Sequence, residues 1–315
     1  MTVDITDCLP RWEDHPVASR YLRQLVRRAD ELRYDVFAAP DHLGGLAPIT
    51  ALTAAGMTSG RLRLRTYVLN TGFWNPALLA REVASLDLLS QGRAELGLGA
   101  GYMRSEHEEA GLPWRPLQQR VQALEGMVVE VRSRLADPGH QPQPVQQPVP
   151  LMVGAMSGPG LSVAARHADI VGFAGLRQIR GTPPGTFTVY SSAETAARVE
   201  QVRQAAGARS YRSDVLLQAV VIGRNPEDAA ARIAASAPGL TVEQLLDTPF
   251  VLLAQDADQA AIELRRRQQT YGFDSVTTHQ PNLEALGEVI AACRGADAPE
   301  SSARAAGNSG AQEGP

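Results

Sequence analysis

Residues 75–98 read Asn75-Pro-Ala-Leu-Leu-Ala-Arg-Glu-Val-Ala-Ser-Leu-Asp-Leu-Leu-Ser-Gln-Gly-Arg-Ala-Glu-Leu-Gly-Leu98 and combine a helical pattern with a strand-like one. Asn75 is a favoured N-cap residue, and Pro76 suits a first helical turn because its missing N–H is not needed there. Gly92 follows the helical pattern at a position where glycine commonly ends a helix. The apolar run Ala94–Leu98 then indicates a buried strand. This stretch therefore predicts one helix followed by one strand.

The same alternation repeats along the chain, with eight strand-like runs separated by helical patterns. We expect strands at Val3–Cys8, Asp35–Ala39, Leu62–Leu69, Ala94–Leu98, Pro150–Val153, Asp169–Ala174, Asp214–Ile222 and Asp274–His279. We expect helices at Val17–Arg33, Ile49–Thr58, Pro76–Ser90, Arg120–Leu135, Leu161–Ala168, Glu194–Ala206, Pro226–Ala237, Asp256–Tyr271 and Leu283–Cys293. This alternation is typical of a closed (β/α)8 barrel or of an open doubly wound sheet.

The strand number and the typical barrel size of about 250 residues favour the closed barrel. The dinucleotide-binding open sheet requires Gly-x-Gly-x-x-Gly directly after a strand. Gly97, Gly99 and Gly101 follow a strand with a different spacing, so we reject that alternative. The sequence thus predicts an α/β fold, a (β/α)8 TIM barrel, as a single domain over residues 1–294. We expect residues 295–315 to form a disordered tail, because they contain little apolar material.

The composition excludes several classes of enzyme. Of the 315 residues, 30 are Lys or Arg, and every one of these is Arg. A chain without lysine cannot form a lysine Schiff base, hold pyridoxal phosphate through one, or carry the phosphate-binding lysine of a Walker-A loop or a kinase. We attribute the missing lysine to GC-rich codon usage. Any anionic cofactor group must then be met by Arg or by backbone amides.

Charge, cysteine content and hydropathy indicate which ligands and which environment the protein is expected to have. The formal net charge of −4 argues against a nucleic-acid-binding protein, which usually shows a basic patch. Cys8 and Cys293 lie near opposite ends without a C-x-x-C spacing, so we expect no metal site and no disulfide framework. The apolar runs are shorter than the ~18 residues of a membrane span, and the N-terminus lacks signal-peptide features. We expect a soluble cytoplasmic protein that binds no nucleic acid and no membrane.

Polar residues follow two of the predicted strands at the end where barrel enzymes place their active sites. Asp41 and His42 follow the second strand, where His42 can exchange a proton near neutral pH. The alternative is an Asp-His pair that only orders a loop. Asn70 marks the tip of the third strand, facing a ligand. Phe73 and Trp74, in the next loop, can wall an apolar pocket or pack against their own barrel.

The stretch that follows the fourth strand, Glu95-Leu-Gly-Leu-Gly-Ala-Gly-Tyr-Met-Arg-Ser-Glu-His107, is the most distinctive one. Its alternate glycines indicate a backbone that approaches a flat ligand closely. Tyr102, Arg104, Glu106 and His107 then gather polar groups at the barrel mouth. We reject a metal site at Glu106 and His107, because adjacent residues rarely share an ion and the sequence offers no evident third ligand.

Two later segments can bind anionic groups. The glycine-rich turn Gly154–Gly160 precedes a predicted helix, whose free N–H groups can hold an anion or a ring carbonyl. The alternative is a tight strand-to-helix connection. Arg177 and Arg180 lie in the long loop 175–190, where paired guanidiniums suit phosphate or carboxylate groups, although a solvated loop is equally consistent. His279 ends the eighth strand and also points to the mouth.

The order and spacing of several motifs resemble the bacterial luciferase-like family, particularly its branch that uses the deazaflavin coenzyme F420. The matching stretches are Tyr34–His42, Asn75–Glu82, Ser85–Arg93, Glu95–Tyr102, Val153–Pro159 and Ala164–Val171. The resemblance implies a TIM barrel with the cofactor ring across its carboxyl-end mouth. The sugar-phosphate dehydrogenases of this family carry Glu where Tyr102 stands, so we do not transfer their chemistry.

The resemblance also implies roles for individual residues. His42 is the first candidate for a catalytic proton donor and Tyr102 the second. A non-proline cis peptide is expected near Val68–Asn70, where it forms a bulge behind the ring. Arg177 or Arg180 would meet the cofactor phosphate. The implied cofactor-binding residues are Asp41, His42, Val68, Leu69, Asn70, Gly154, Ala155, Met156, Ser157, Gly158, Arg177 and Arg180, and no metal is implied.

Three functions remain open at this point. The leading hypothesis is an F420-dependent oxidoreductase that transfers a hydride between the deazaflavin and a small organic substrate. The second is an FMN-dependent luciferase-like monooxygenase that uses O2 and a partner reductase. The third is a non-catalytic flavin- or ligand-binding barrel, whose cellular role would survive His42→Ala and Tyr102→Phe. Family analogy further implies a homodimer, with a flavin or F420 reductase supplying the reduced cofactor.

Overall fold

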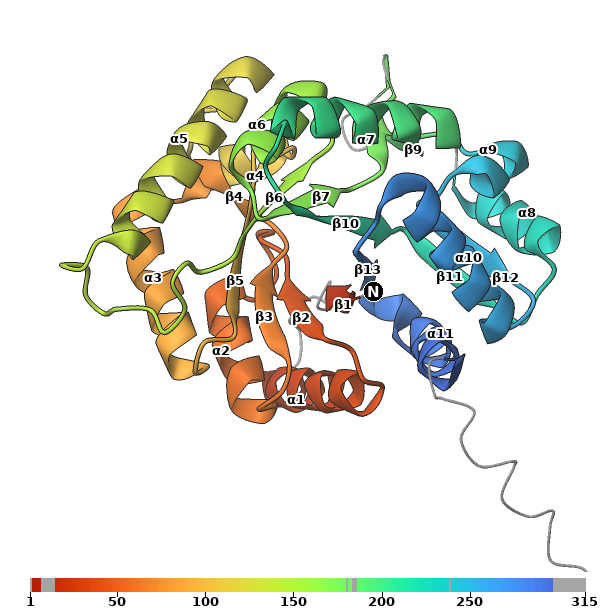
Figure 1. The fold of residues 1–315 in the computed structure, drawn as a ribbon, viewed down its shortest axis with the longest axis horizontal. Coiled ribbons are helices and arrows are strands. Elements are labelled where there is room, and N and C mark those ends of the chain that lie inside the picture. Colours follow the sequence, from red (N-terminus) through yellow and green to blue (C-terminus); the bar gives the residue numbers. More distant parts are fainter. Residues whose placement is uncertain (1, 7–14, 180, 183–185, 238, 297–315) are drawn as a thin grey trace, which may run out of the picture.

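The computed structural model describes residues 2–6, 15–179, 181–182, 186–237 and 239–296. Its centre is a curled parallel sheet that contains nine strands of the described chain (Figure 1). Their order is β3-β2-β1-β13-β10-β7-β6-β5-β4, and β3 also pairs with β5. These strands are β1 (Thr2–Thr6), β2 (Val36–Ala39), β3 (Arg63–Thr66), β4 (Leu69–Asn70), β5 (Ala94–Gly99), β6 (Leu151–Ala155), β7 (Ile170–Phe173), β10 (Arg212–Leu217) and β13 (Ser275–His279).

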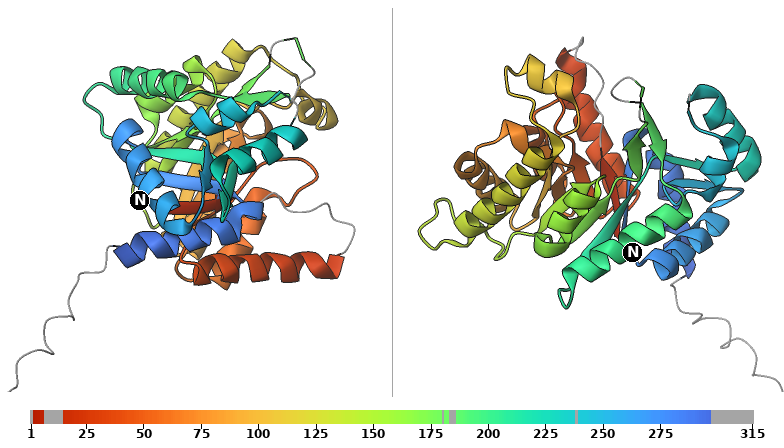
Figure 2. Two further views of the ribbon diagram at one scale, coloured as in Figure 1. Left: turned by 90° about the vertical axis from the view of Figure 1, so that its right-hand side faces the viewer. Right: turned by 90° about the horizontal axis from the view of Figure 1, so that it is seen from above.

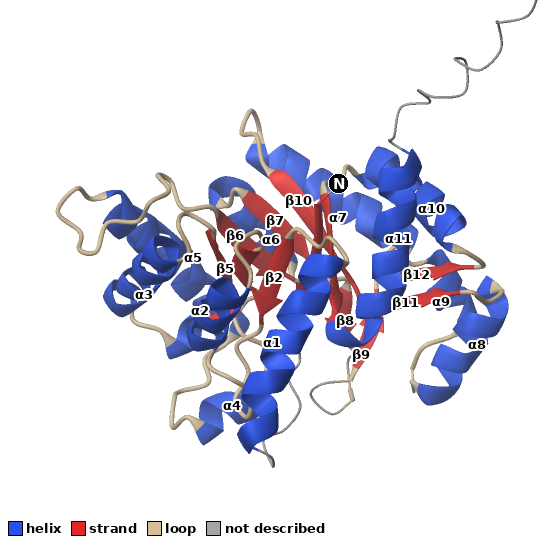
Figure 3. Cartoon of the chain, turned by 90° about the horizontal axis from the view of Figure 1, so that it is seen from below, coloured by secondary structure: helices blue, strands red, loops and turns tan. Residues whose placement is uncertain are grey.

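Helices lie around the outside of this sheet, as Figures 1 and 3 show. They are α1 (His15–Glu31), α2 (Pro48–Thr58), α3 (Pro76–Leu89), α4 (Arg104–Glu109), α5 (Leu117–Ala136), α6 (Gly158–His167), α7 (Ser192–Ala206), α8 (Pro226–Ser236), α9 (Val242–Asp247), α10 (Ala257–Tyr271) and α11 (Leu283–Ala296). The expected N-cap of α3 is confirmed, because Asn75 Oδ1 accepts the N–H of Ala77 at 2.9 Å. Within the described ranges, no helix has the length and apolar character needed to cross a membrane.

Two small sheets accompany the main one. Strands β11 (Ala219–Ile222) and β12 (Val251–Ala254) pair in parallel, with α8, α9 and α10 packed against β12. Side chains from this region form a separate buried cluster around Leu245. Strands β8 (Leu176–Gln178) and β9 (Phe187–Val189) form an antiparallel pair between β7 and α7. Figure 2 shows from above how this pair projects beyond the sheet.

The structure corrects three of the expected segments and adds elements that the sequence did not predict. The predicted seventh strand, Asp214–Ile222, is two strands, and β11 leaves the main sheet to pair with the unpredicted β12. Gln218 lies at the break, where its N–H donates to Phe250 O at 2.7 Å. The predicted third strand is likewise divided into β3 and β4, the predicted loop 175–190 contains β8 and β9, and α4 and α9 were not expected. Cys8, Arg180 and residues 297–315 of the predicted tail lie outside the described residues.

A charged cluster occupies the interior of the curled sheet. Arg65 on β3 is fully buried, and its Nε donates to Glu95 Oε2 on β5 at 2.6 Å. Arg63 Nε donates to the other oxygen, Glu95 Oε1, at 2.5 Å. Arg65 Nη1 also lies 3.7 Å from Asp214 Oδ1 on β10. Because β3 and β10 are not neighbours in the sheet order, this contact crosses the interior and requires the sheet to curl.

Asp214 connects this cluster to Tyr67, which follows β3, and to β13. It accepts hydrogen bonds from Tyr67 Oη at 2.8 Å, Ser275 Oγ at 2.6 Å and Thr277 Oγ1 at 2.9 Å. Ser275 and Thr277 are two residues apart on β13 and therefore face the same side of the sheet. The polar positions of these strands thus point inward, and each buried charge has a partner there.

Glu95 should be essential for stability because it neutralises a buried guanidinium. We expect Glu95→Gln to lower the free energy of unfolding by about 3–5 kcal/mol, since the buried Arg65 would keep only the more distant carboxylate of Asp214. Urea denaturation at pH 7 measures this loss. Glu284→Gln is the matched control, because its ion pair with Arg28 is exposed and screened by solvent and should contribute little to stability. Equal losses in the two variants would contradict this role.

The same carboxylate predicts a loss of stability in acid. Burial by itself would raise the pKa of Glu95, but the adjacent Arg65 and Arg63 guanidiniums lower it below its ordinary value. A depressed carboxyl pKa stabilises the fold above the unfolded-state pKa of about 4.3 and loses that contribution as the pH falls below it. We therefore expect the unfolding free energy of the wild type to fall on acidification from pH about 5, and that of Glu95→Gln to fall less.

Candidate active site

The predicted residues of three separate segments come together at the carboxyl ends of the strands. Asp41 and His42 follow β2, Asn70 ends β4, and Tyr102 follows β5. Tyr102 Oη lies 3.4 Å from His42 Nε2, and the two rings meet edge to face with their centroids 5.7 Å apart. The two residues predicted to carry proton chemistry are therefore neighbours, although 60 positions separate them in the chain.

Asp41 joins two of these segments. Its Oδ2 accepts the N–H of Asn70 at 3.0 Å and the indole Nε1–H of Trp74 at 2.9 Å. Burial raises the pKa of the Asp41 carboxyl, and these two donors oppose the shift. The loop after β2 is thus fixed to the loop after β4. Trp74 therefore holds the Asp41 side chain in place. A direct contact of Asp41 with a cofactor stays a prediction.

Glu106 is the residue at this site whose partner the sequence did not reveal. Its Oε1 lies 2.8 Å from His42 Nδ1 and also accepts the N–H of Leu43 at 3.2 Å. The Glu106 side chain is only 9% exposed, whereas that of His42 is 37% exposed. The sequence places Glu106 in a polar cluster but does not link it to His42, because the short helix α4 that turns it inward has no recognisable sequence pattern.

His107, the next residue along the chain, contacts the side chain of Asn70. Asn70 Oδ1 accepts the N–H of Gly72, which leaves its amide Nδ2 to donate to His107 Nε2 at 3.1 Å. The His107 ring lies 5.1 Å from the rings of Phe73 and Trp114. Phe73 and His107 therefore pack next to the strand tip at Asn70. Among the residues that the structure describes, no group of three or more His, Cys, Asp or Glu side chains could hold a metal ion.

Val68 fills the space that the glycines of β5 and β6 leave open. A Cβ atom at Gly99 would lie 2.7 Å from Val68 Cγ2, and one at Gly154 would lie 3.0 Å from Val68 Cγ1. A Cβ at Gly97 would lie 2.0 Å from the carbonyl oxygen of Thr66. These glycines thus accommodate the protein's own β3–β4 segment, and a close approach of their backbone to a flat ligand stays a prediction.

The peptide bond between Tyr67 and Val68 is cis. The resemblance predicted a non-proline cis bond near Val68–Asn70, and the observed bond adjoins that range. Val68 keeps part of its side chain exposed at the carboxyl ends of the strands. Leu69, by contrast, is fully buried and Asn70 nearly so. Of the three predicted residues in this segment, Val68 is the one with exposed apolar surface, and its contact with a ligand stays a prediction.

The predicted anion-binding turn is held from α7. Ser157 Oγ accepts the N–H of Gly160 and caps α6. The carbonyl oxygen of Met156 accepts from Tyr190 Oη at 2.9 Å and from Arg198 Nη1 at 3.2 Å. Arg198 also stacks over the Tyr190 ring, with its guanidinium carbon 3.8 Å from the ring centroid. Arg198, which sequence analysis did not single out, therefore places a cation beside this turn.

The structure describes one of the two arginines that are expected to meet the cofactor phosphate. Arg177 forms an ion pair with Glu194 at the start of α7 and remains 45% exposed. Arg180 lies outside the described residues. The β8–β9 pair, which carries Arg177, also contacts the site. Phe187 on β9 packs edge to face on Tyr102, with the two ring centroids 5.8 Å apart. Figure 3 shows α4 and this pair at the same end of the molecule.

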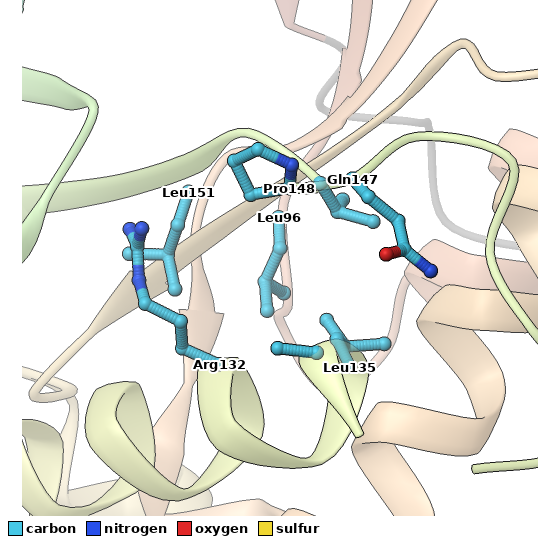
Figure 4. Close-up of a pocket in the computed structure, with 8 residues that line it drawn as sticks. Leu96, Arg132, Leu135, Gln147, Pro148 and Leu151 are labelled. Carbon is cyan, nitrogen blue, oxygen red and sulfur yellow. The ribbon is translucent and has the colours of Figure 1, made fainter. Parts of the chain in front are cut away.

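Two other features lie outside this cluster. His279 ends β13 as expected, but its Nε2 lies 3.3 Å from Gln218 Oε1 and burial lowers the pKa of its ring, which favours the neutral form. A cavity of about 290 Å³ lies between the end of α5 and the amino-terminal parts of β5 and β6 (Figure 4). Leu96, Leu135 and Leu151 line it, so this cavity is at the other end of the strands from His42 and Tyr102.

The fold and this polar cluster define an α/β protein with a curled parallel sheet and a site at the carboxyl ends of its strands. The family model of luciferase-like monooxygenases matches residues 5–285. The chain therefore belongs to the luciferase-like monooxygenase family, which confirms the resemblance seen in the sequence.

The names of individual relatives mention different cofactors. The chain is 30% identical over 176 residues to an F420-dependent glucose-6-phosphate dehydrogenase of Amycolatopsis mediterranei, covering 49% of this chain and 51% of that protein. It is 26% identical over 180 residues to an FMNH2-dependent dimethylsulfone monooxygenase of Pseudomonas putida, covering 52% and 46%. The chain thus spans about half the length of these curated relatives.

Solved structures share the fold at low sequence identity. An F420-dependent secondary alcohol dehydrogenase in complex with an F420-acetone adduct matches with a TM-score of 0.72 and 14% identity. The match covers 93% of this chain and 99% of that one. At this identity the likeness shows the common fold.

The packing of Val68 into the glycine positions can be tested by mutation. We expect Gly99→Ala to lower the free energy of unfolding by about 1–3 kcal/mol, because its Cβ would overlap Val68 Cγ2. Val68→Ala in the same chain should recover part of this loss, as a double-mutant cycle of urea denaturation would show. Gly126→Ala on α5 is the control, since nothing lies within 4 Å of its added Cβ. A cycle without coupling would refute the packing.

Proposed function

We propose that this protein is an F420-dependent oxidoreductase that transfers a hydride between the deazaflavin and a small organic substrate. The observation that carries the proposal is the contact between His42 and Tyr102 at the carboxyl ends of the strands, within a family that includes F420-dependent enzymes. We further propose that the main sheet closes as the (β/α)8 barrel over a single domain of residues 1–294. The pairing of β3 with both β2 and β5 supports that closure.

The residues at this end fit a flat ring with an anionic tail. The partly exposed Val68 offers apolar surface, while His42 and Tyr102 offer a ring nitrogen and a hydroxyl. The turn at the start of α6, with Arg198 beside it, offers backbone amides and a cation to a phosphate. The bound deazaflavin would supply the hydride chemistry, and the protein would position the substrate and move its proton.

Tyr102 is one of the two residues expected to exchange a proton with the substrate. We expect Tyr102→Phe to lower kcat by about 10²- to 10⁴-fold, because the ring remains and only the hydroxyl is lost. The Kd for the cofactor should not change. Steady-state kinetics with small alcohols and ketones, followed by the deazaflavin absorbance, measure the first quantity and fluorescence titration the second. Full activity in this variant would refute the role.

The cofactor itself is tested by anaerobic titration of the purified protein with F420 and with FMN. Saturable binding of F420 that is tighter than that of FMN would support the proposal. Tight binding of FMN without binding of F420 would favour an FMN-dependent monooxygenase with O2 and a partner reductase, and the FMNH2-dependent relative gives that alternative its support. Binding without turnover of any substrate would favour a non-catalytic barrel.

The remaining expectations are part of the same proposal. We propose a cytoplasmic enzyme that acts as a homodimer on a small-molecule substrate, with a flavin or F420 reductase supplying reduced cofactor. The contacts assigned above to Asp41, Leu69, Asn70, the segment Gly154–Gly158 and Arg177 belong to this proposal as well. Leu69 is fully buried, so its contribution would come from its backbone.

A further inference from the structure

We propose that Glu106 is a positioning residue that holds the His42 imidazole in its Nδ1–H form, so that Nε2 faces Tyr102 and completes a proton path from substrate to His42. The inference rests on the proposed function for the reaction that the path serves. The placement of Glu106, however, is a property of the folded chain that can be measured without cofactor.

The geometry requires Glu106 to act as an acceptor. Its Oε1 is shared by two donors, His42 Nδ1 at 2.8 Å and the N–H of Leu43 at 3.2 Å. A carboxylate has no proton to give, so the ring nitrogen that faces it must carry the hydrogen. The neutral imidazole has only one N–H, and Nε2 is therefore left as the acceptor.

Two other charged side chains in the described part of these loops have their own partners. Asp41, the neighbouring carboxyl, directs Oδ2 to the Asn70 N–H and to the indole of Trp74. Arg104, which begins α4, donates from Nε to Glu108 at 2.7 Å. Glu106, by contrast, accepts directly from His42 and Leu43. Its near-complete burial makes the hydrogen bond with His42 stronger than it would be in water.

The path from Nε2 leads to the phenol. Tyr102 Oη lies 3.4 Å from His42 Nε2, and the Tyr102 residue is 45% exposed at the carboxyl ends of the strands, where a substrate would bind. When an alcohol is oxidised, its O–H proton passes to Tyr102 Oη as the tyrosine's own proton passes to His42 Nε2. The electron pair of the carbinol C–H bond leaves as the hydride of the proposed reaction, and a carbonyl forms. Reduction of a carbonyl runs the same transfers backwards.

Glu106 has a second effect on this transfer. His42 becomes an imidazolium when it takes the proton, and the adjacent carboxylate balances that charge without having to move. Glu106→Gln separates this effect from simple anchoring, because its amide oxygen can still accept from His42 and Leu43 while the negative charge is lost. Glu106→Leu removes both the acceptor and the charge at similar size.

The tautomer can be observed directly by NMR on full-length protein with 15N-labelled histidine rings. The chain has six histidines, and His42→Gln identifies the His42 signals. In weakly alkaline solution, the wild type and Glu106→Gln should show His42 protonated at Nδ1, whereas Glu106→Leu should show a shift towards the Nε2–H form. Glu109→Gln, exposed on the same helix, is the control and should match the wild type. A wild-type His42 protonated at Nε2 would overturn the proposal, whatever Glu106→Leu does.

Kinetics test the consequence. We expect Glu106→Gln to lower kcat by about 10- to 100-fold with little change in KM, as for other residues that act through a catalytic group. Wild-type kcat in Glu106→Leu, which removes both the acceptor and the charge, would show that the tautomer of His42 does not serve the reaction and would overturn the proposal. If the protein binds no F420, the proposed function fails, while the NMR result still decides whether Glu106 sets the tautomer of His42.

Discussion

The buried charge of Arg65 is the constraint on which the rest of the structure depends. A fully buried guanidinium is tolerated only with carboxylate partners, and the two that it meets come from β5 and from β10. Only a sheet that curls brings these strands to the same point, since β3 and β10 lie far apart in its order. The charge cluster therefore makes one particular curvature of the sheet much more favourable than a flat arrangement.

The candidate site is built directly on this cluster. Tyr67 donates its hydroxyl hydrogen to Asp214, and the next residue, Val68, packs over the glycines of β5 and β6. Two residues further on, Asn70 is held by Asp41 and by His107. Each contact fixes the next, so the segment that carries the strand tip has little freedom. The charged cluster inside the sheet and the residues at the carboxyl ends of its strands are thus parts of one network of contacts.

Much of the fold could be predicted from local patterns, and the failures have physical causes. The cap at Asn75 and the run Ala94–Leu98 are local signals, and the structure confirms both. The division of Asp214–Ile222 into two strands has no local signal, because Gln218 breaks the strand through contacts with Phe250 and Ala174, distant in the chain. The alternate glycines indicated a close approach, but the sequence could not show that Thr66, Val68 and Asn70 of the protein's own chain approach them.

The sequence by itself determined the family, the alternating α/β order and the restriction of its cations to arginine, because these depend on residue identity and spacing along the chain. It also placed His42 and Tyr102 at strand ends, which is a consequence of strand position alone. Only the tertiary structure decided that Glu106 faces His42, that Arg177 pairs with Glu194 and that Arg198 lies beside the turn before α6. Those pairings join residues from separate loops, whose relative positions are set by packing of the whole sheet.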